Sequence, residues 1–148
     1  MSQIIVDEHL GLREVLLPIR RWITAQKVES LKPGEVLKDD RLLQVLTHLN
    51  KPTLITIDED FWDRRYLDRR YCLLYFALPE GQQRHIPILL RRLLRLRPFK
   101  TKAARMGKVA RITFTQVSFW QLGSNNLCTF VWLPTQGRSS DASPYSLL

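Results

Sequence analysis

Apolar residues occur along this chain as short continuous runs that alternate with helical stripes. The run at 3–6 predicts a buried strand, and the apolar spacing over 12–23 predicts an amphipathic helix with Pro18 as a kink or a late start. A second helix is expected from Asp39, a plausible N-cap, to residue 49, where Asn and Pro follow. The β-branched run at 53–57 then predicts another buried strand.

The second half of the chain continues this alternation. We expect a strand at 71–78, a helix at 86–96 with Pro87 in its first turn, a strand-like alternation over 109–119 and a further strand at 127–133. Whether the last strand pairs within the sheet or covers an edge stays open. Strands that alternate with helices predict an α/β fold with a mainly parallel central sheet flanked by helices, which binds ligands beyond the carboxyl ends of its strands.

The length of 148 residues indicates one compact domain. We place it at 1–122, followed by an additional strand at 123–134 and a flexible tail at 135–148. No apolar run approaches the ~20 residues needed to span a bilayer, and no leader pattern opens the chain, so a cytoplasmic protein without a membrane partner is expected. Cys72 and Cys128 are far apart in apolar surroundings, which argues against a disulfide framework and a structural zinc site.

Charge divides the chain into two unlike halves. The chain has 23 Lys and Arg against 14 Asp and Glu, a net charge of +9; residues 1–79 are balanced at 12 of each kind, so the excess lies after Pro79. Nine basic residues and no acidic residue occur between Arg91 and Arg111. This excess predicts an anionic partner, either RNA or an acidic protein segment, and we expect the basic half to bring a polyanion to the acidic half.

A second basic segment follows the strand at 53–57, where arginines are interleaved with aromatic residues. Guanidinium groups bind phosphates and aromatic rings stack on unpaired bases, so this segment could hold single-stranded RNA. The alternative is that Asp63 and Asp68 pair with these arginines on a solvated surface. The candidate nucleic-acid-binding residues of both segments are Arg64, Arg65, Arg69, Arg70, Arg91, Arg92, Arg95, Lys100, Lys102, Arg105 and Lys108.

Carboxylates follow two of the predicted strands and open the helix between them. Asp7 ends the first strand, Asp58 and Asp60 follow 53–57, and Asp39 and Asp40 begin the helix. If the two strands are parallel neighbours, these side chains converge, and Asp58 and Asp60 face the same way while the chain stays extended. Facing carboxylates suit a hard cation such as Mg²⁺ or Mn²⁺. The alternative for each Asp is a role in capping or turning the backbone.

Three segments carry a resemblance to a known family: VDEHL at 6–10, DDRLLQVL at 39–46 and LITIDEDF at 54–61. Together they resemble the PIN-like domain family, in particular small bacterial PIN-like proteins that are often toxin components of toxin–antitoxin pairs. The most specific part is a Thr-x-Asp-x-Asp-Phe pattern at the end of a strand. The residues that match it are Thr56, Asp58, Asp60 and Phe61.

The resemblance implies a PIN-like three-layer sandwich over 1–122 and a Mg²⁺- or Mn²⁺-dependent ribonuclease that hydrolyses RNA phosphodiester bonds, with an antitoxin as a partner. It implies catalytic and metal-binding roles for Asp7, Asp40, Asp58 and Asp60. The helix acid has two candidates: Asp40 keeps the usual interval to Asp58, whereas Asp39 better matches the paired leucines that follow. We prefer Asp40 slightly and retain Asp39 as a metal ligand.

The chain departs from the family in its greater length, its basic run at 91–111 and its extra strand and tail after Leu122. A second hypothesis is therefore a non-catalytic module that binds nucleic acid or an acidic protein through 91–111. A third is a subunit of a larger complex, docked through 127–133 and the tail; a homo-oligomer is also compatible with the sequence. No Gly-rich phosphate loop, GxSxG or HExxH motif is present, which argues against triphosphatase, serine hydrolase and zincin chemistry.

Overall fold

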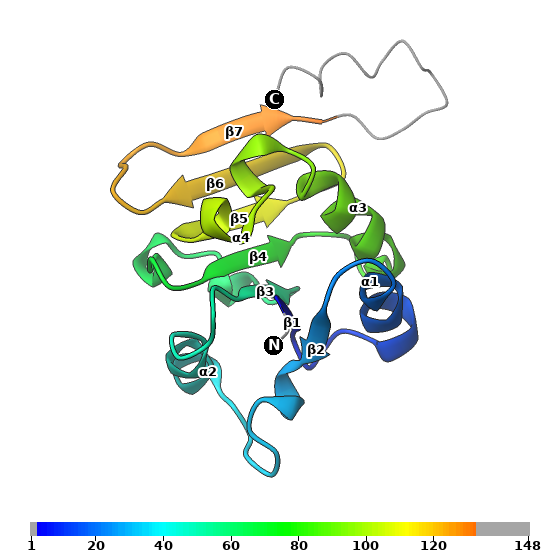
Figure 1. The fold of residues 1–148 in the computed structure, drawn as a ribbon. Coiled ribbons are helices and arrows are strands. Elements are labelled where there is room, and N and C mark those ends of the chain that lie inside the picture. Colours follow the sequence, from blue (N-terminus) through cyan, green and yellow to red (C-terminus); the bar gives the residue numbers. More distant parts are fainter. Residues whose placement is uncertain (1–2, 133–148) are drawn as a thin grey trace.

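A computed structural model describes residues 3–132, and its strands form one sheet (Figure 1). In the order β2-β1-β3-β4-β5-β6-β7, the first five strands are mutually parallel and the last two are antiparallel to their neighbours. The α/β architecture with a mainly parallel sheet is thereby confirmed. The strands are β1 (Ile4–Val6), β2 (Ala25–Lys27), β3 (Thr53–Thr56), β4 (Cys72–Phe76), β5 (Lys108–Ile112), β6 (Gln116–Gln121) and β7 (Cys128–Val131).

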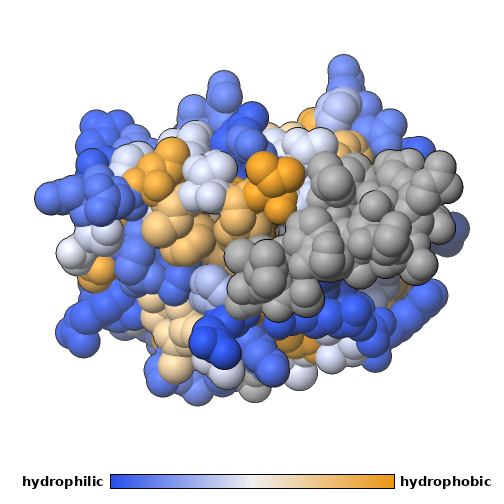
Figure 2. Space-filling model, turned by 90° about the horizontal axis from the view of Figure 1, so that it is seen from above, coloured by the Kyte–Doolittle hydropathy of each residue, from blue (hydrophilic) through white to orange (hydrophobic). Residues whose placement is uncertain are grey.

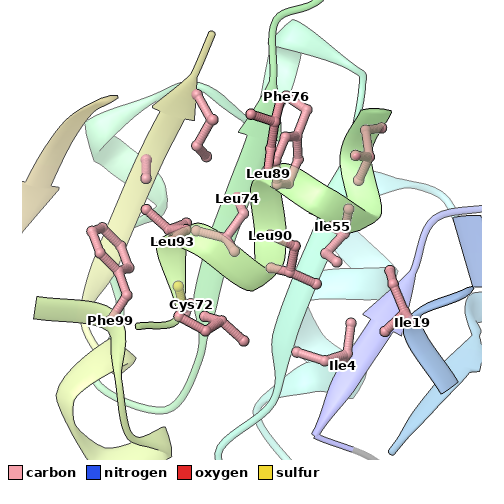
Figure 3. Packing of buried hydrophobic residues seen from close by; sticks show 14 of the residues in the cluster. Ile4, Ile19, Ile55, Cys72, Leu74, Phe76, Leu89, Leu90, Leu93 and Phe99 are labelled. Carbon is pink, nitrogen blue, oxygen red and sulfur yellow. The ribbon is translucent and has the colours of Figure 1, made fainter. Parts of the chain in front are cut away.

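Helices pack on both faces of this sheet. One core joins α1, α3 and the segment before α4 to the sheet, and a separate core joins α2 to the opposite face. Figure 3 shows the first core, where Leu90 and Leu93 of α3 lie over Ile55 and Leu74 of the strands. The helices are α1 (Leu17–Arg20), α2 (Asp39–Leu46), α3 (Ile86–Leu93) and α4 (Lys102–Arg105).

The central strands are buried on both faces, which explains their continuous apolar sequences. In β1, Ile4 and Val6 belong to the core under α3, whereas Ile5 belongs to the core under α2. The same alternation in β3 directs Leu54 toward α2 and Ile55 toward α3. A side chain's place in the sequence thus decides which face of the sheet it occupies.

The helix expected over 12–23 is shorter and less regular than predicted. Residues Leu12–Leu16 form a π-helical turn, and the α-helix covers only Leu17–Arg20. Pro18 has no amide hydrogen and its ring crowds the carbonyl four residues earlier, so the ordinary hydrogen-bond pattern cannot run through it. The backbone bonds before it reach one residue further back, as in Leu16 N–H to the Gly11 carbonyl at 3.2 Å.

The alternation over 109–119 is wrong as a single strand, because β5 and β6 form an antiparallel hairpin. The side-chain oxygen of Thr113 accepts hydrogen bonds from the amides of Thr115 and Gln116 at 3.2 and 3.0 Å and closes the turn between them. The helix expected at 86–96 ends at Leu93, and the sequence did not predict β2 or α4.

The strand expected at 127–133 is β7, which pairs with β6 at the edge of the sheet. Seen from above, this side of the molecule gathers hydrophobic side chains among hydrophilic ones (Figure 2). The exposed large apolar residues of β7 and its surroundings are Leu122, Leu127 and Val131. The tail expected at 135–148 lies outside the described residues. Within 3–132, no helix is long and apolar enough to cross a membrane.

The sheet changes its winding direction between β1 and β3. The chain leaves β1 toward β2 on one side, but it leaves β3 toward β4 on the other side. In parallel α/β sheets such a switch point opens a crevice at the carboxyl ends of the two strands, where ligands bind. Here those ends carry Asp7 and Asp58.

Candidate metal centre

Three carboxylates from two elements meet at this switch point. Asp39 is the first residue of α2, and Asp58 and Asp60 directly follow β3. One oxygen atom of each lies within 4.8 Å of the corresponding oxygens of the other two, a spacing that a single metal ion can bridge. Of the five predicted metal ligands, these three form the compact group found in the described part of the chain.

Asp58 and Asp60 come together through a turn, which differs from the extended geometry expected from the sequence. The backbone of Glu59–Phe61 forms one 3₁₀ turn, and the Asp58 carboxylate caps it by accepting the Asp60 amide at 3.0 Å. Phe61 is buried in the core under α2 and anchors the turn. The capping alternative is therefore confirmed for Asp58, and its second oxygen makes no hydrogen bond within 3–132.

The helix acid in the cluster is Asp39, so the slight preference for Asp40 is not supported by the geometry. Successive helical residues are about 100° apart around the axis, and only one of the two can face the carboxylates of Asp58 and Asp60. The prediction of Asp39 as N-cap is also wrong. Lys38 occupies that position and no side chain caps the helix, so the Asp39 carboxylate, in the first turn, is directed to the cluster instead.

Asp7, at the carboxyl end of β1, is buried and is held by hydrogen bonds. It is 6% exposed; its Oδ2 accepts from Thr56 Oγ1 at 2.6 Å, and its Oδ1 accepts from the Glu8 amide at 2.8 Å. Thr56 Oγ1 in turn accepts the Asp58 amide at 3.0 Å. One hydroxyl therefore joins the carboxyl ends of β1 and β3 and positions Asp7 relative to Asp58. The sequence motif contained Thr56, but gave it no role of its own.

The cluster is electrostatically uncompensated. Burial raises the pKa of Asp39, and the negative charges of Asp58 and Asp60, then of Asp7 and Asp40, raise it further. Within residues 3–132, no Lys or Arg forms an ion pair with any of these carboxylates. A divalent cation would relieve this repulsion. Because the group supplies only carboxylate oxygens, it suits hard ions such as Mg²⁺ or Mn²⁺ better than zinc, which favours Cys and His.

An open groove of about 610 Å³ gives access to the acids of α2. Tyr66 lines the groove together with these acids; burial raises its pKa, and the charges of Asp40, Asp63 and Asp39 raise it further. The groove is lined by Glu8, Val36, Leu37, Lys38, Asp39, Asp40 and Tyr66.

The arginines that follow the cluster are largely held by local partners. Arg65 pairs with Asp63 at 2.6 Å and Arg70 pairs with Asp68 at 2.9 Å, and these contacts lower the pKa of both aspartates. The alternative predicted for this segment, local pairing on a solvated surface, is confirmed for these two pairs. Arg64 instead packs on the ring of a tryptophan in β6, and Arg69 is exposed.

Two predicted nucleic-acid-binding residues, Arg105 and Lys108, are interior and must be removed from that set. Arg105 is 1% exposed and donates to Thr53 Oγ1, the Phe99 carbonyl and Gln3 Oε1 at 2.9, 3.0 and 2.8 Å. Lys108 is 8% exposed and donates to a backbone carbonyl of α4. Both cations are buried and donate to neutral protein acceptors, so neither can reach a phosphate in this conformation.

The basic residues of α3 and of the segment that follows it do not adjoin the carboxylates either, which corrects the expected convergence of these parts of the two halves; Arg111 lies instead in β5, in register with Tyr75 of β4. α3 packs on the opposite face of the sheet from α2, the helix that supplies Asp39. Arg91 and Arg92 of α3 lie over the rings of Trp22 and Trp132 at 5.7 and 4.9 Å. Arg95, Lys100 and Lys102 follow in the segment that covers this same face.

Comparison of the chain with protein-family models, curated proteins and solved structures found no match. A function for the chain is therefore inferred from the chemistry of its own residues. Among the described residues, the carboxylates at the switch point are a group that could hold a metal ion.

Proposed function

We propose that this chain is a metal-dependent endoribonuclease of the PIN-like type, with a three-layer sandwich as its fold. The observation that carries the proposal is the convergence of Asp39, Asp58 and Asp60 at the switch point of the sheet, with no cation paired to them in the described residues. The resemblance of the surrounding motifs to PIN-like nucleases supports the choice of reaction.

In this proposal Asp39, Asp58 and Asp60 hold Mg²⁺ or Mn²⁺, and Asp40 remains a neighbour at the groove. A bound ion of this kind lowers the pKa of a water molecule and neutralises the charge of a phosphodiester. Asp7 and Thr56 act as positioning residues, because their hydrogen bond at 2.6 Å fixes the strand ends that carry the ligands. The groove beside α2 would admit the RNA backbone.

The test compares cleavage of end-labelled single-stranded RNA in Mn²⁺ by the wild-type chain, by Asp58→Asn and by a control, Asp68→Asn. Asp68 is a nearby carboxylate that is held by Arg70 and lies outside the cluster. We expect cleavage by wild type and control, loss of at least about 100-fold in Asp58→Asn, and full inhibition by EDTA. Equal cleavage by all three proteins, or no cleavage of any RNA by wild type, contradicts the proposal.

A toxin role in the cytoplasm, with an antitoxin that covers the site, extends the same proposal. Its test is regulated expression in a bacterial host. Wild type should arrest growth and Asp58→Asn should not, whereas normal growth with active wild-type enzyme would remove the toxin role and leave the nuclease.

A second candidate is a non-catalytic binding module, favoured by the absence of any Asp or Glu between residues 81 and 132. It predicts RNA or acidic-protein binding that weakens steeply with salt but persists in EDTA and in Asp58→Asn. Such binding without cleavage by the wild-type protein would favour the module over the nuclease.

A further inference from the structure

One half of the sheet lacks a helix on the side that faces α2. The core under α2 ends at Val109 of β5, and among residues 3–132 it contains no residue of β6 or β7. The opposite side of β6 is covered, since Val117 and Phe119 lie in the core under α3. The alternate residues of β5, β6 and β7 therefore form a sheet face without a helical cover in the described structure.

A row of polar residues runs across this face from the candidate metal centre. The strand register aligns Thr56 with Tyr75, Tyr75 with Arg111, Arg111 with Ser118, and Ser118 with Thr129. At ~4.8 Å per strand, the row is about 19 Å long. It begins at Thr56, the residue whose hydroxyl donates to Asp7. Thr56 is fully buried and Ser118 is 7% exposed, so the accessible part of the row consists of Tyr75, Arg111 and Thr129, and it adjoins the carboxyl end of β3.

The charge on this face is positive. The guanidinium of Arg111 makes no hydrogen bond or ion pair with any residue in the described part of the chain. A second cation, Arg64, lies 4.5 Å from the ring centre of Trp120, which projects from the same side of β6 as Ser118. The four strands β4, β5, β6 and β7 contain no acidic residue.

Tyr75 stands between this face and the acids. The strand register places Tyr75 beside Thr56 of β3 and beside Arg111 of β5. Burial raises the pKa of Tyr75, the charges of Glu59 and Asp58 raise it further, and the charge of Arg111 lowers it. With Trp120 further along, the face carries two partly exposed aromatic rings interspersed with cations.

We propose that the open face of β4, β5 and β6 binds single-stranded nucleic acid and leads it to the carboxylates. Bases stack on Tyr75, and phosphates contact Arg111 and the guanidinium of Arg64, which lies on the Trp120 ring. Aromatic rings on an exposed sheet combined with cations are the chemistry that holds unpaired bases and their backbone, whereas a duplex keeps its bases stacked internally. The inference rests on the proposed nuclease in one respect, namely that the bound strand is RNA to be cleaved.

The first test uses a matched pair of charge substitutions on β7, in the Asp58→Asn background so that RNA stays intact. Thr129 and Cys128 are both exposed neighbours on this edge strand, and their side chains point to opposite faces. We expect Thr129→Glu to weaken the binding of a fluorescein-labelled oligouridine in EDTA by at least about fivefold, and Cys128→Glu to change it less than about twofold. Thermal melting of both variants checks that each is folded.

The second test removes one cation from each face. Arg111→Gln should weaken binding about tenfold and reduce the slope of log affinity against log salt by about 1. Arg13→Gln should change neither, because Arg13 is exposed on the Leu12–Leu16 turn that covers the other face of the sheet. Arg111→Lys should restore most of the affinity because it retains the charge. Oligothymidine is measured in parallel; equal affinities mean that the face does not distinguish RNA from DNA.

The inference is overturned if the two faces respond equally, if no oligonucleotide binds, or if sedimentation shows the face buried in a dimer that Thr129→Glu dissociates. It fails while the nuclease stands if wild type cleaves RNA and Thr129→Glu, with Asp58 intact, cleaves it equally well at limiting RNA. If oligonucleotide binding follows the pattern above but the wild-type protein cleaves no RNA, the proposed nuclease activity is contradicted and the binding face is supported.

Discussion

Charged side chains at the two ends of the parallel strands lie in opposite environments. At the amino ends, Arg105 is buried and each of its hydrogen bonds goes to a neutral acceptor from an adjoining element. At the carboxyl ends, Asp39, Asp58 and Asp60 are partly exposed, face one another and have no cationic partner within residues 3–132.

This difference separates a charge that is satisfied within the fold from a group of charges that could hold a metal ion. A buried charge that is fully hydrogen bonded fixes the packing of the elements around it and has nothing left to offer a ligand. A group of like charges destabilises the fold slightly, and this repulsion is relieved by a bound cation or by protonation. Net charge along the sequence does not distinguish the two cases, because Arg105 and Arg111 contribute equally to it.

The largest expected effect is at the amino ends. Arg105→Met leaves Thr53, the Phe99 carbonyl and Gln3 without their donor, so the free energy of unfolding should fall by at least about 3 kcal/mol. Urea denaturation measures it. The exposed control Arg95→Met should stay within about 0.5 kcal/mol of wild type. A small loss in Arg105→Met would mean that this end is not the structural one.

Metal binding should stabilise the carboxyl ends. With Mn²⁺ at 100 times its dissociation constant, the wild-type protein gains about 2.7 kcal/mol, which raises the melting temperature by roughly 5–10 °C over its value in EDTA. Asp58→Asn should lose this shift, whereas Asp63→Asn, which removes a carboxylate held by Arg65, should keep it. Equal shifts in the two variants would argue for non-specific binding.

The hydroxyl of Thr56 should matter to both stability and metal affinity. Thr56→Val leaves Asp7 Oδ2 and the Asp58 amide without a partner, which costs about 1–3 kcal/mol and displaces a ligand-bearing strand end. Thr56→Ser retains the hydroxyl and should recover most of the Mn²⁺ affinity. Calorimetric titration of both variants checks this, and a Val variant that binds Mn²⁺ like wild type would remove Thr56 from its positioning role.

The smallest effect concerns the metal-free protein. Asp39→Asn removes a repelled charge and should raise stability at pH 7 by at most about 1 kcal/mol while it weakens Mn²⁺ binding. Because the folded-state pKa of Asp39 is raised above 3.8, its contribution to stability is present below 3.8 and is lost as the pH rises through the folded-state pKa. In melting curves measured from below pH 3.8 upward, the metal-free wild-type protein should show this loss of stability with rising pH, and Asp39→Asn should lack it.

The sequence predicted the strands that are buried on both faces and the helix that is buried on one side. β1, β3 and β4 are buried on both faces and read as continuous apolar runs, and the periodicity of α2 follows from its single buried side. β2 was missed because only Ala25 of its three residues is buried, so it has no strand pattern. The turn between β5 and β6 was missed because Thr113 replaces the usual glycine or proline signal.

The candidate site was predictable in its residue types but not in its details. The motif around β3 identified Asp58 and Asp60, but the choice between Asp39 and Asp40 depends on the rotation of α2 about its axis. The burial of Arg105 follows from Gln3 and Thr53, which are 102 and 52 residues away in the sequence. The alignment of Arg111 with the carboxylate end requires strand register, which the apolar pattern leaves open.

The most direct test of the central claim, that the carboxyl ends hold a divalent metal, is paramagnetic broadening by Mn²⁺ of backbone amide signals in the ¹⁵N-labelled protein. At substoichiometric Mn²⁺, the amides of 7–8, 39–40 and 58–60 should broaden first, those of 103–108 should stay sharp, and Asp58→Asn should abolish the selectivity. Broadening that is uniform, that centres on another acidic segment, or that persists unchanged in Asp58→Asn would contradict the claim.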